Sequence, residues 1–356
     1  MGDNQRVTLT LRTPLCRELG IEYPIFSVGF GISAGPELVS AVSNARGCGV
    51  LGGIGIPAVE LQRRIARVRE LTDRPFGVNV IIADFEDPQS PDEDRALVRE
   101  QIEVAVEARV ALIVLFWGPP APFVEGAHRN GVKVFIQVGS LAEAEAAAAA
   151  GVDAVIAQGI EAGGHIRGTT SIWELLPAAI EAVKPVPVLA SGGIGDGAGI
   201  ARALRLGAQA VSLGTRFVAS EEAWVHPLYK QRVVDSTAED TVYGELFDAW
   251  WPNAPHRVLR NKTSDEWDAA GRPPSGNRPG EGTTIGARRT STGELQPWPR
   301  YATGMLTPDF EGDIEYAALL AGESCSVVND IKPAGVIVRD LVRGAEAALA
   351  EAEQLV

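Results

Sequence analysis

The residues best suited to chemistry stand together between Ala157 and His165, in the run AQGIEAGGH. This run follows the short β-type segment Asp153–Ile156, so it should leave the carboxyl end of a strand. Gly163 and Gly164 would let the backbone approach a flat or charged ligand closely. His165 then stands at the edge of the opening, and an imidazole can accept or release a proton near neutral pH. A glycine-rich turn with a solvated histidine is the alternative.

Two further glycine-rich turns have the composition of a phosphate site. Ser191 to Gly195 reads SGGIG and enters a predicted helix, and Leu213 to Phe217 reads LGTRF. Successive backbone N–H groups near a helix N-terminus bind phosphate, and the hydroxyl of Thr215 adds a donor. Tight packing of a helix on a strand at glycine is the alternative. Gly29-Phe30-Gly31 lacks the third glycine of a dinucleotide fingerprint and no Walker motif occurs, so a mononucleotide such as FMN fits better.

Predicted strands and predicted helices, which must position these turns, alternate along the chain up to Thr215. Continuous apolar runs predict parallel strands that are buried on both faces. These runs are Pro24–Val28, Gly49–Leu51, Phe76–Ile82, Ala111–Phe116, Lys133–Val138, Ala154–Ala157, Pro187–Ala190 and Ala210–Leu213. Segments with helical character lie between them, at Pro36–Ala45, Ala58–Leu71, Glu93–Ala108, Leu141–Ala150, Ser171–Val183 and Asp196–Leu206.

Eight strands with intervening helices predict an α/β protein, a (β/α)8 TIM barrel, with a doubly wound open sheet as the rival. The richest glycine turns follow the seventh and eighth runs. Barrels often bind phosphate at those two turns, which favours the barrel.

The pattern changes after about Asp235. Val242–Met305 is weakly periodic, rich in Pro, Gly and Arg, and contains Trp250, Trp251, Trp267 and Trp298. Arg272–Gly280 predicts an exposed loop. Periodicity returns in Ile314–Leu320 and Gly335–Leu355. We therefore predict a barrel over residues 1–235, a smaller capping and substrate-pocket region over 236–330, and a C-terminal helix over 331–356 that packs back on the body.

Composition restricts the class of protein. The chain has 356 residues, 46% hydrophobic and 22% charged, as in a globular protein with ample core. A net charge of −14 argues against a nucleic-acid or anionic-membrane partner. Cys16, Cys48 and Cys325 lie far apart, so we expect neither a disulfide framework nor a metal site. With no signal-type N-terminus and no apolar run of membrane-spanning length, the expected location is cytoplasmic.

These pieces together resemble the nitronate monooxygenase family, whose flavin barrel is shared by enoyl-acyl-carrier-protein reductase II and some NAD(P)H:quinone reductases. The resemblance covers Thr13 to about Phe217 and Leu320–Val342. It is carried by Pro24-Ile25-Phe26, Gly29-Phe30-Gly31, Gly77-Val78-Asn79, Gln158 to His165, Ser191 to Gly195, Gly214 to Phe217, Ala321-Gly322-Glu323 and Asp330 to Ala334.

The resemblance implies an FMN-dependent barrel, with the FMN phosphate between Gly192-Gly193 and Gly214-Thr215. Asn79 and Gln158 would reach the flavin ring or ribityl chain, and His165 matches the family's catalytic histidine. The full set of residues expected to bind FMN is Gly29, Phe30, Gly31, Asn79, Gln137, Gln158, Gly163, Gly164, Ser191, Gly192, Gly193, Gly214 and Thr215.

Three departures from the family pattern bear on the substrate. After His165 the sequence continues Ile166-Arg167-Gly168, which matches neither the His-Arg-Gly of the monooxygenases nor the His-Ile-Gly of the enoyl reductases. Gln137 stands where some flavin relatives place a lysine beside the ring, and a neutral amide stabilises an anionic reduced flavin less. Residues 242–305 have no clear match to the short monooxygenase lid.

The leading functional hypothesis is oxidation of an alkyl nitronate or nitroalkane with O2 to a carbonyl compound and nitrite, with His165 as general base toward the neutral nitroalkane. An NAD(P)H-dependent reductase acting on a quinone or enoyl thioester is the second hypothesis. A non-catalytic flavin- or phosphate-ligand-binding protein is the third. The expected partner is a small molecule in each case. Association of the chain into a homo-oligomer is left as an open alternative.

The other candidate side chains have simpler interpretations. His128 is interpreted as a solvated helix-end residue, His226 as structural, and His256 as a cap residue that is more often structural than in contact with substrate. Trp250 and Trp251 either wall the pocket or pack the cap on the barrel. Glu161 either orients the imidazole of His165 or bonds backbone within its turn.

Overall fold

The computed structural model describes residues 11–289 and 293–353. Parallel strands form one sheet in the order β1-β9-β8-β6-β5-β4-β3-β2. A parallel bridge between Phe26 and Cys48 joins the two outer strands β1 and β2, which closes the sheet into a barrel. The strands are β1 (Ile25–Ser27), β2 (Gly49–Gly52), β3 (Phe76–Ile81), β4 (Leu112–Phe116), β5 (Lys133–Val138), β6 (Ala154–Gln158), β8 (Val188–Ser191) and β9 (Ala210–Leu213). The predicted (β/α)8 barrel is therefore confirmed.

The barrel strands are apolar throughout because both of their faces are buried. Successive side chains point to opposite faces, so alternate residues fill the barrel interior. Phe26, Phe135, Ile156 and Leu189 belong to this interior cluster. Leu15, Cys16 and Leu19 of helix α1 (Pro14–Leu19) join the same cluster. The residues between them face the surrounding helices and form the larger outer cluster.

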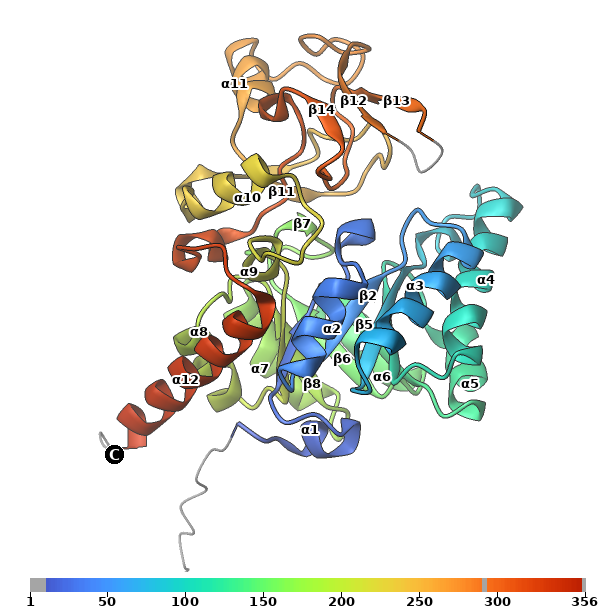
Figure 1. Ribbon diagram of the computed structural model, residues 1–356, viewed down its shortest axis with the longest axis vertical. Coiled ribbons are helices and arrows are strands. Elements are labelled where there is room, and N and C mark those ends of the chain that lie inside the picture. The colour runs from blue at the N-terminus through green and yellow to red at the C-terminus, as the bar shows by residue number, and fades with distance from the viewer. Residues whose placement is uncertain (1–10, 290–292, 354–356) are drawn as a thin grey trace, which may run out of the picture.

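The helices that cover the barrel are α2 (Pro36–Asn44), α3 (Ala58–Leu71), α4 (Asp92–Glu107), α5 (Ala121–Arg129), α6 (Leu141–Ala149), α7 (Ile172–Ala182) and α8 (Gly197–Arg205). Helix α12 (Ala334–Glu353) returns from the far end of the chain and packs between α8 and α2 (Figure 1). It covers the barrel where the eighth helix of the fold belongs. The end of the predicted segment Gly335–Leu355 lies outside the described residues.

Helix α5 was not predicted from the sequence. It begins within the run Gly118-Pro119-Pro120-Ala121-Pro122, whose prolines indicate a loop. Proline is nevertheless tolerated in the first turn of a helix, where the missing N–H has no partner in any case.

A second layer of structure covers the carboxyl ends of the barrel strands (Figure 1). It contains helices α9 (Thr215–Val218), α10 (Pro227–Val234) and α11 (Lys262–Ala269) and two small antiparallel sheets. One sheet has the order β10 (Thr241–Gly244), β11 (His256–Leu259), β7 (Gly164–His165), and the other has the order β13 (Leu295–Pro299), β12 (Thr284–Arg289), β14 (Phe310–Gly312). We call residues 236–320 the cap.

Two details of the cap differ from the sequence-based expectation. Within Ile314–Leu320 the structure has only a 3-10 turn, η4 (Ile314–Tyr316), before the chain pairs Leu320 with Val258. Within the predicted exposed loop 272–280, Arg278 is buried because its guanidinium pairs with Asp248 and Glu281.

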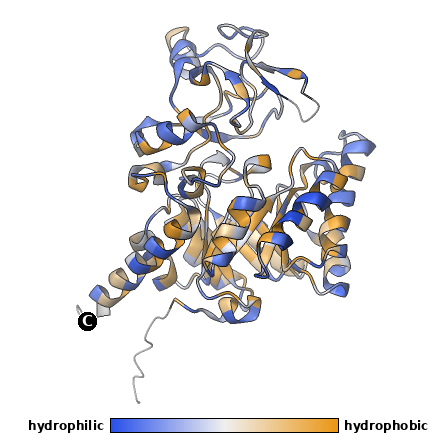
Figure 2. Ribbon diagram, viewed as in Figure 1, coloured by the Kyte–Doolittle hydropathy of each residue, from blue (hydrophilic) through white to orange (hydrophobic). Residues whose placement is uncertain are grey.

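Apolar residues concentrate in the barrel strands, whereas the cap is mixed (Figure 2). The cap has its own small core, to which Leu246, Phe247, Val258 and Tyr301 belong. Within the described ranges, every helix is too short or too polar to cross a lipid bilayer.

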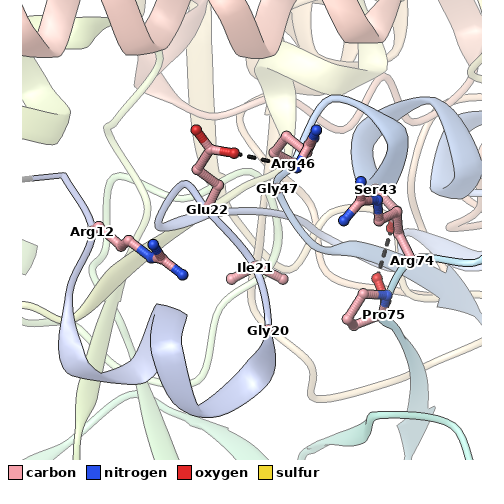
Figure 3. A pocket seen from close by; sticks show the side chains of 9 residues that line it. All are labelled: Arg12, Gly20, Ile21, Glu22, Ser43, Arg46, Gly47, Arg74 and Pro75. Atoms are coloured by element: carbon pink, nitrogen blue, oxygen red, sulfur yellow. Dashed lines mark hydrogen bonds and ion pairs between the residues drawn. The ribbon is translucent and has the colours of Figure 1, made fainter.

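A cavity of about 260 Å³ lies at the amino-terminal end of the strands, between the segments that lead into β1, β2 and β3 (Figure 3). Arg12, Arg46 and Arg74 line it, and Arg46 forms an ion pair with Glu22 at 3.4 Å. A second cavity, of about 400 Å³, lies beside α2 and α3 and is lined in part by Trp224. Neither cavity is lined by a residue that the sequence predicts to bind FMN.

Candidate active site

Polar side chains form the top layer of the barrel interior. Asn79, Gln137, Gln158 and Ser191 each occupy an inward position in a barrel strand, above the apolar layers that contain Phe135 and Leu189. Gln158 lies directly beside Ser191 in the sheet register. The carboxyl end of the barrel therefore presents hydrogen-bonding groups around its mouth, which is where barrel enzymes place their active sites.

The two predicted phosphate turns lie side by side. Strands β8 and β9 are neighbours, with Ser191 paired to Ser212, so their following turns open on the same part of the rim. Gly192 and Gly193 have φ values of 94° and 69°, in the left-handed region that favours glycine. Within the described residues, no group accepts a hydrogen bond from the N–H groups of Gly192, Gly193 or Gly214. Three donors without a described acceptor, in adjacent turns, are the kind of arrangement that binds an anion such as a phosphate.

The segment Ala321–Glu323 packs against the second of these turns. The N–H of Gly322 donates to the hydroxyl of Thr215 at 3.0 Å. The N–H of Glu323 donates to the carbonyl of Glu161, also at 3.0 Å. A side chain at Gly163 would overlap the backbone of Gly322, so this contact requires glycine. Because Thr215 accepts the bond from Gly322, its own hydroxyl proton stays available for a phosphate.

Gln158 holds the histidine loop in place. Its side-chain amide donates to the carbonyl of His165 at 2.9 Å, and its side-chain oxygen accepts from the N–H of Arg167 at 3.1 Å. The Arg167 guanidinium in turn bridges Glu86 and Glu143, each at 2.6 Å, and lies over the ring of Trp117. These contacts fix both ends of the short segment that carries His165. Contact of Gln158 with flavin stays a prediction.

The imidazole of His165 lies in an aromatic cage. The ring centroids of Trp251, His256 and Trp117 are 4.2 Å, 5.6 Å and 6.1 Å from that of His165. Its Nδ1 lies 3.3 Å from the carbonyl oxygen of Ala254. Burial lowers the pKa of His165 to about 4, and the neighbouring His256 adds to that effect. The ring is therefore neutral at physiological pH, with one nitrogen unprotonated.

The remaining residues expected to contact the flavin ring come from the turn after β1 and from the ends of β3 and β5. Gly29 lies directly against Asn79, and the backbone of Gly31 lies against Gly52 at the end of β2. The Asn79 amide donates to the carbonyl of Val114 at 3.0 Å. Phe30 is half-buried beside this group. Gln137 is also half-buried and makes no side-chain hydrogen bond with the described residues, so its amide is available at the mouth.

Several other candidates have structural roles. Glu161 accepts hydrogen bonds from the hydroxyl of Ser171 and from the N–H of Ile172, so it holds the start of α7 and does not orient His165. His226 accepts from the N–H of Leu228 and caps α10, as its structural interpretation predicted. His128 is half-exposed but pairs with Asp153 at 2.7 Å.

The two cap tryptophans differ in role. Trp251 packs on the ring of His165, whereas Trp250 packs on Trp298 with a centroid separation of 4.7 Å. Only Trp251 therefore walls the candidate site.

Sequence reasoning missed Trp117 and the carbonyl of Ala254. Trp117 follows β4 directly and has a φ of 64°, which is uncommon for a bulky residue and concentrates at functional sites. The available signal was its place after a barrel strand, where loops carry catalytic residues. No sequence signal identifies the Ala254 carbonyl, which reaches His165 from 89 positions away.

Comparison with known proteins identifies the family of this chain. A family model described as nitronate monooxygenase matches residues 12–344. A 5-hydroxy-7a-methyl-1-oxo-octahydro-1H-indene-4-carboxyl-CoA dehydrogenase of Rhodococcus jostii is 36% identical, covering 74% of this chain and 69% of the relative. The structure of FabK from Thermotoga maritima is 30% identical with a TM-score of 0.77, covering 98% of this chain and 100% of the other.

A nitroalkane oxidase from Streptomyces ansochromogenes is 27% identical with a TM-score of 0.74, covering 94% of this chain and 98% of the other. The family match extends over nearly the whole chain and includes both the barrel and the cap. The chain therefore belongs to the nitronate monooxygenase family of flavin-dependent oxidoreductases.

Proposed function

We propose that this protein is an FMN-dependent nitronate monooxygenase, which oxidises alkyl nitronates and nitroalkanes with O2 to a carbonyl compound and nitrite. The observation that carries the proposal is the neutral imidazole of His165, which lies inside an aromatic cage at the barrel mouth with its Nδ1 against the carbonyl of Ala254. The similarity to a nitroalkane oxidase supports the same substrate class.

FMN is the flavin that the rim suits best. The free N–H groups at Gly192, Gly193 and Gly214 would hold its single phosphate, with the Thr215 hydroxyl beside them. Asn79 and Gln137 would offer amides to the ring from the inward layer of the barrel. Bound FMN would supply the redox chemistry of the reaction, and the chain supplies position and electrostatics.

His165 would take the proton from the carbon next to the nitro group, at Nε2. The proton on Nδ1 donates to the carbonyl of Ala254, so this bond would strengthen as positive charge develops on the ring. Trp117 and Trp251 cover the ring and reduce its contact with water. A nitronate already lacks this proton and needs no base.

Replacing His165 with Asn tests the base role directly. We expect His165→Asn to bind FMN normally and to lose turnover of a neutral nitroalkane by about 10²- to 10⁴-fold, while turnover of the preformed nitronate changes far less. Steady-state oxygen consumption with both forms of one substrate measures this. His128→Asn, at the exposed carboxyl end of α5, is the matched control. Equal losses on nitroalkane and nitronate would refute the base role.

Redox chemistry on a thioester is the second candidate, because one relative is a carboxyl-CoA dehydrogenase at 36% identity. A reductase of this kind would require His165 to donate a proton or orient substrate. The depressed pKa opposes proton donation, since the protonated imidazolium that would donate is scarce near neutral pH. Anaerobic mixing with NADH or NADPH separates the candidates: rapid bleaching of the flavin supports a reductase, and a stable oxidised spectrum supports the monooxygenase.

A further inference from the structure

We propose that His256 is a positioning residue: acting through the carbonyl of Ala254, it holds the proton of His165 on Nδ1 and leaves Nε2 as the base nitrogen. The structural part of this inference stands alone, and its catalytic consequence rests on the function proposed above. His256 belongs to cap strand β11 and is 1% exposed.

The protonation state of the His256 ring follows from its two partners. Its Nε2 lies 3.1 Å from the backbone N–H of Phe247, which can only donate. Nε2 must therefore accept and cannot carry a proton. Its Nδ1 lies 3.0 Å from the carbonyl oxygen of Ala254, which can only accept, so Nδ1 carries the proton. Both ring nitrogens are satisfied in one tautomer of the neutral ring.

The carbonyl of Ala254 is shared between the two histidines. It accepts from Nδ1 of His256 at 3.0 Å and faces Nδ1 of His165 at 3.3 Å. A carbonyl oxygen has two lone pairs, so it can accept both protons at once. The opposite tautomer of His165 would direct the Nδ1 lone pair at this oxygen. His256 thus holds in place the acceptor that selects the His165 tautomer.

The backbone around this carbonyl joins the cap to the barrel loop. His256 and His165 are paired residues of the antiparallel strands β11 and β7. The N–H of Ile166 donates to the carbonyl of Pro255 at 2.8 Å. Ala254 is 2% exposed as a whole residue, so water has little access to compete for its carbonyl. The arrangement is rigid on both sides, as an outer partner that sets the orientation of a reactive histidine must be.

Two amide substitutions at position 256 separate the two hydrogen bonds of the ring. An asparagine side chain places its amide near the position of Nδ1, so His256→Asn can still donate to Ala254. A glutamine side chain reaches the position of Nε2, so His256→Gln can still accept from Phe247 but leaves the Ala254 carbonyl without its partner. Each variant therefore removes one bond and keeps the other.

The first measurement is kinetic, on the FMN-loaded enzyme. We expect His256→Gln to lower kcat/KM for a neutral nitroalkane by about 10- to 100-fold, the usual effect of losing an outer partner of a reactive histidine. His256→Asn should retain most of this activity, and both variants should oxidise the preformed nitronate as the parent does. Equal losses in both variants and on both substrates would mean that His256 only stabilises the fold, and would overturn the proposal.

The second measurement does not depend on activity. The chain has 4 histidines, so ¹⁵N-histidine labelling followed by long-range ¹H–¹⁵N spectra resolves each imidazole and reports its tautomer. We expect His165 to carry its proton on Nδ1 in the parent and in His256→Asn, and to lose this preference in His256→Gln. A proton on Nε2 in the parent, or an unchanged spectrum in His256→Gln, would overturn the proposal. The expected spectra without nitroalkane turnover would support the positioning role and contradict the proposed function.

Discussion

At the residue scale, the central feature is a histidine whose basicity is reduced by its surroundings. His165 is covered by Trp251 and Trp117, and burial of the ring disfavours its charged form. An ordinary imidazole with a pKa near 6.5 is partly protonated in mildly acidic solution and then cannot act as a base. As the proposed base, His165 would stay in its unprotonated, active form over a wider range of pH, because its pKa is depressed.

This gives a prediction for the pH dependence of turnover. The base is active when it is unprotonated, so activity is lost as the pH falls through the pKa of the free enzyme. We expect kcat/KM for a neutral nitroalkane to stay level down to about pH 5 and to fall with a midpoint near 4, as the pKa of His165 requires. A pH profile measured by oxygen consumption tests this, and the residual activity of His165→Asn should lack the acidic limb. A midpoint near 6.5 would contradict the buried environment of the ring.

Trp117 is the second residue of interest at this scale. Its left-handed backbone directs a large ring across the mouth, where it contacts His165, Trp251 and the guanidinium of Arg167. Backbone strain of this kind, on the order of 1–3 kcal/mol, persists only where surrounding contacts hold it. The ion pairs of Arg167 with Glu86 and Glu143 provide such contacts.

At the element scale, the turns after β8 and β9 are the proposed cradle for the FMN phosphate. The turn after β9 continues at once into α9, and the turn after β8 reaches α8 through a short loop. Within the described residues the N–H groups of Gly192, Gly193 and Gly214 have no hydrogen-bond acceptor. Gly193 lies over Glu161, whose carboxylate holds the start of α7. Glu161, which lies in the histidine loop, therefore contacts both the Gly192-Gly193 turn and the start of α7.

A substitution in this turn tests the cradle. Alanine at Gly193 would occupy a left-handed conformation and bring its Cβ within 3.0 Å of Glu161. We expect Gly193→Ala to weaken FMN binding at least about tenfold, or roughly 1.4 kcal/mol, because the turn must shift and its N–H groups move with it. Titration of FMN fluorescence measures the affinity.

Gly207→Ala is the matched control for this prediction. Gly207 also has a positive φ, of 102°, but lies in the loop between α8 and β9 at the other end of the barrel. The two variants should lose similar thermal stability, and only Gly193→Ala should lose FMN. Equal loss of FMN affinity in both would show that the effect is one of general destabilisation.

The elements were more predictable than the site. Strands such as β4 and β5 are buried on both faces, so their apolar runs are visible in the sequence, and the turns after β8 and β9 are marked by glycine. The surroundings of His165 come from the cap, through Trp251, Ala254 and His256, and such long-range contacts leave no local pattern. Helix α5 was missed because its prolines indicate a loop when read alone.

At the scale of the whole molecule, barrel and cap are interlocked. One continuous cluster of buried apolar residues includes Leu306 and Phe310 of the cap together with the outer faces of the barrel strands. Arg257 of β11 donates to the carbonyl of Ile160 at 2.9 Å and pairs with Glu323 at 3.0 Å. The chain then returns to the barrel, where α12 packs on α2 and α8.

This interlocking predicts cooperative unfolding. We expect a single thermal transition by calorimetry, because neither barrel nor cap can open without exposing the shared cluster. FMN at a free concentration 100 times its Kd should stabilise the whole molecule by about 2.7 kcal/mol and raise the Tm of that one transition. Riboflavin, which lacks the phosphate, serves as the control and should raise the Tm less. Two transitions, of which only one responds to FMN, would contradict the prediction.

The pairing of β7 with β11 has a further consequence for how this enzyme can diverge. His165 is one of the two β7 residues whose backbone pairs with β11 and so joins the cap to the barrel. An insertion that shifts this register by one residue would turn the His165 side chain to the other face of the sheet. Selection for a new substrate therefore cannot change the length and sequence of the cap without constraint. A changed cap must keep these two residue pairs of β7 and β11 in register, or another residue must take over as proton acceptor.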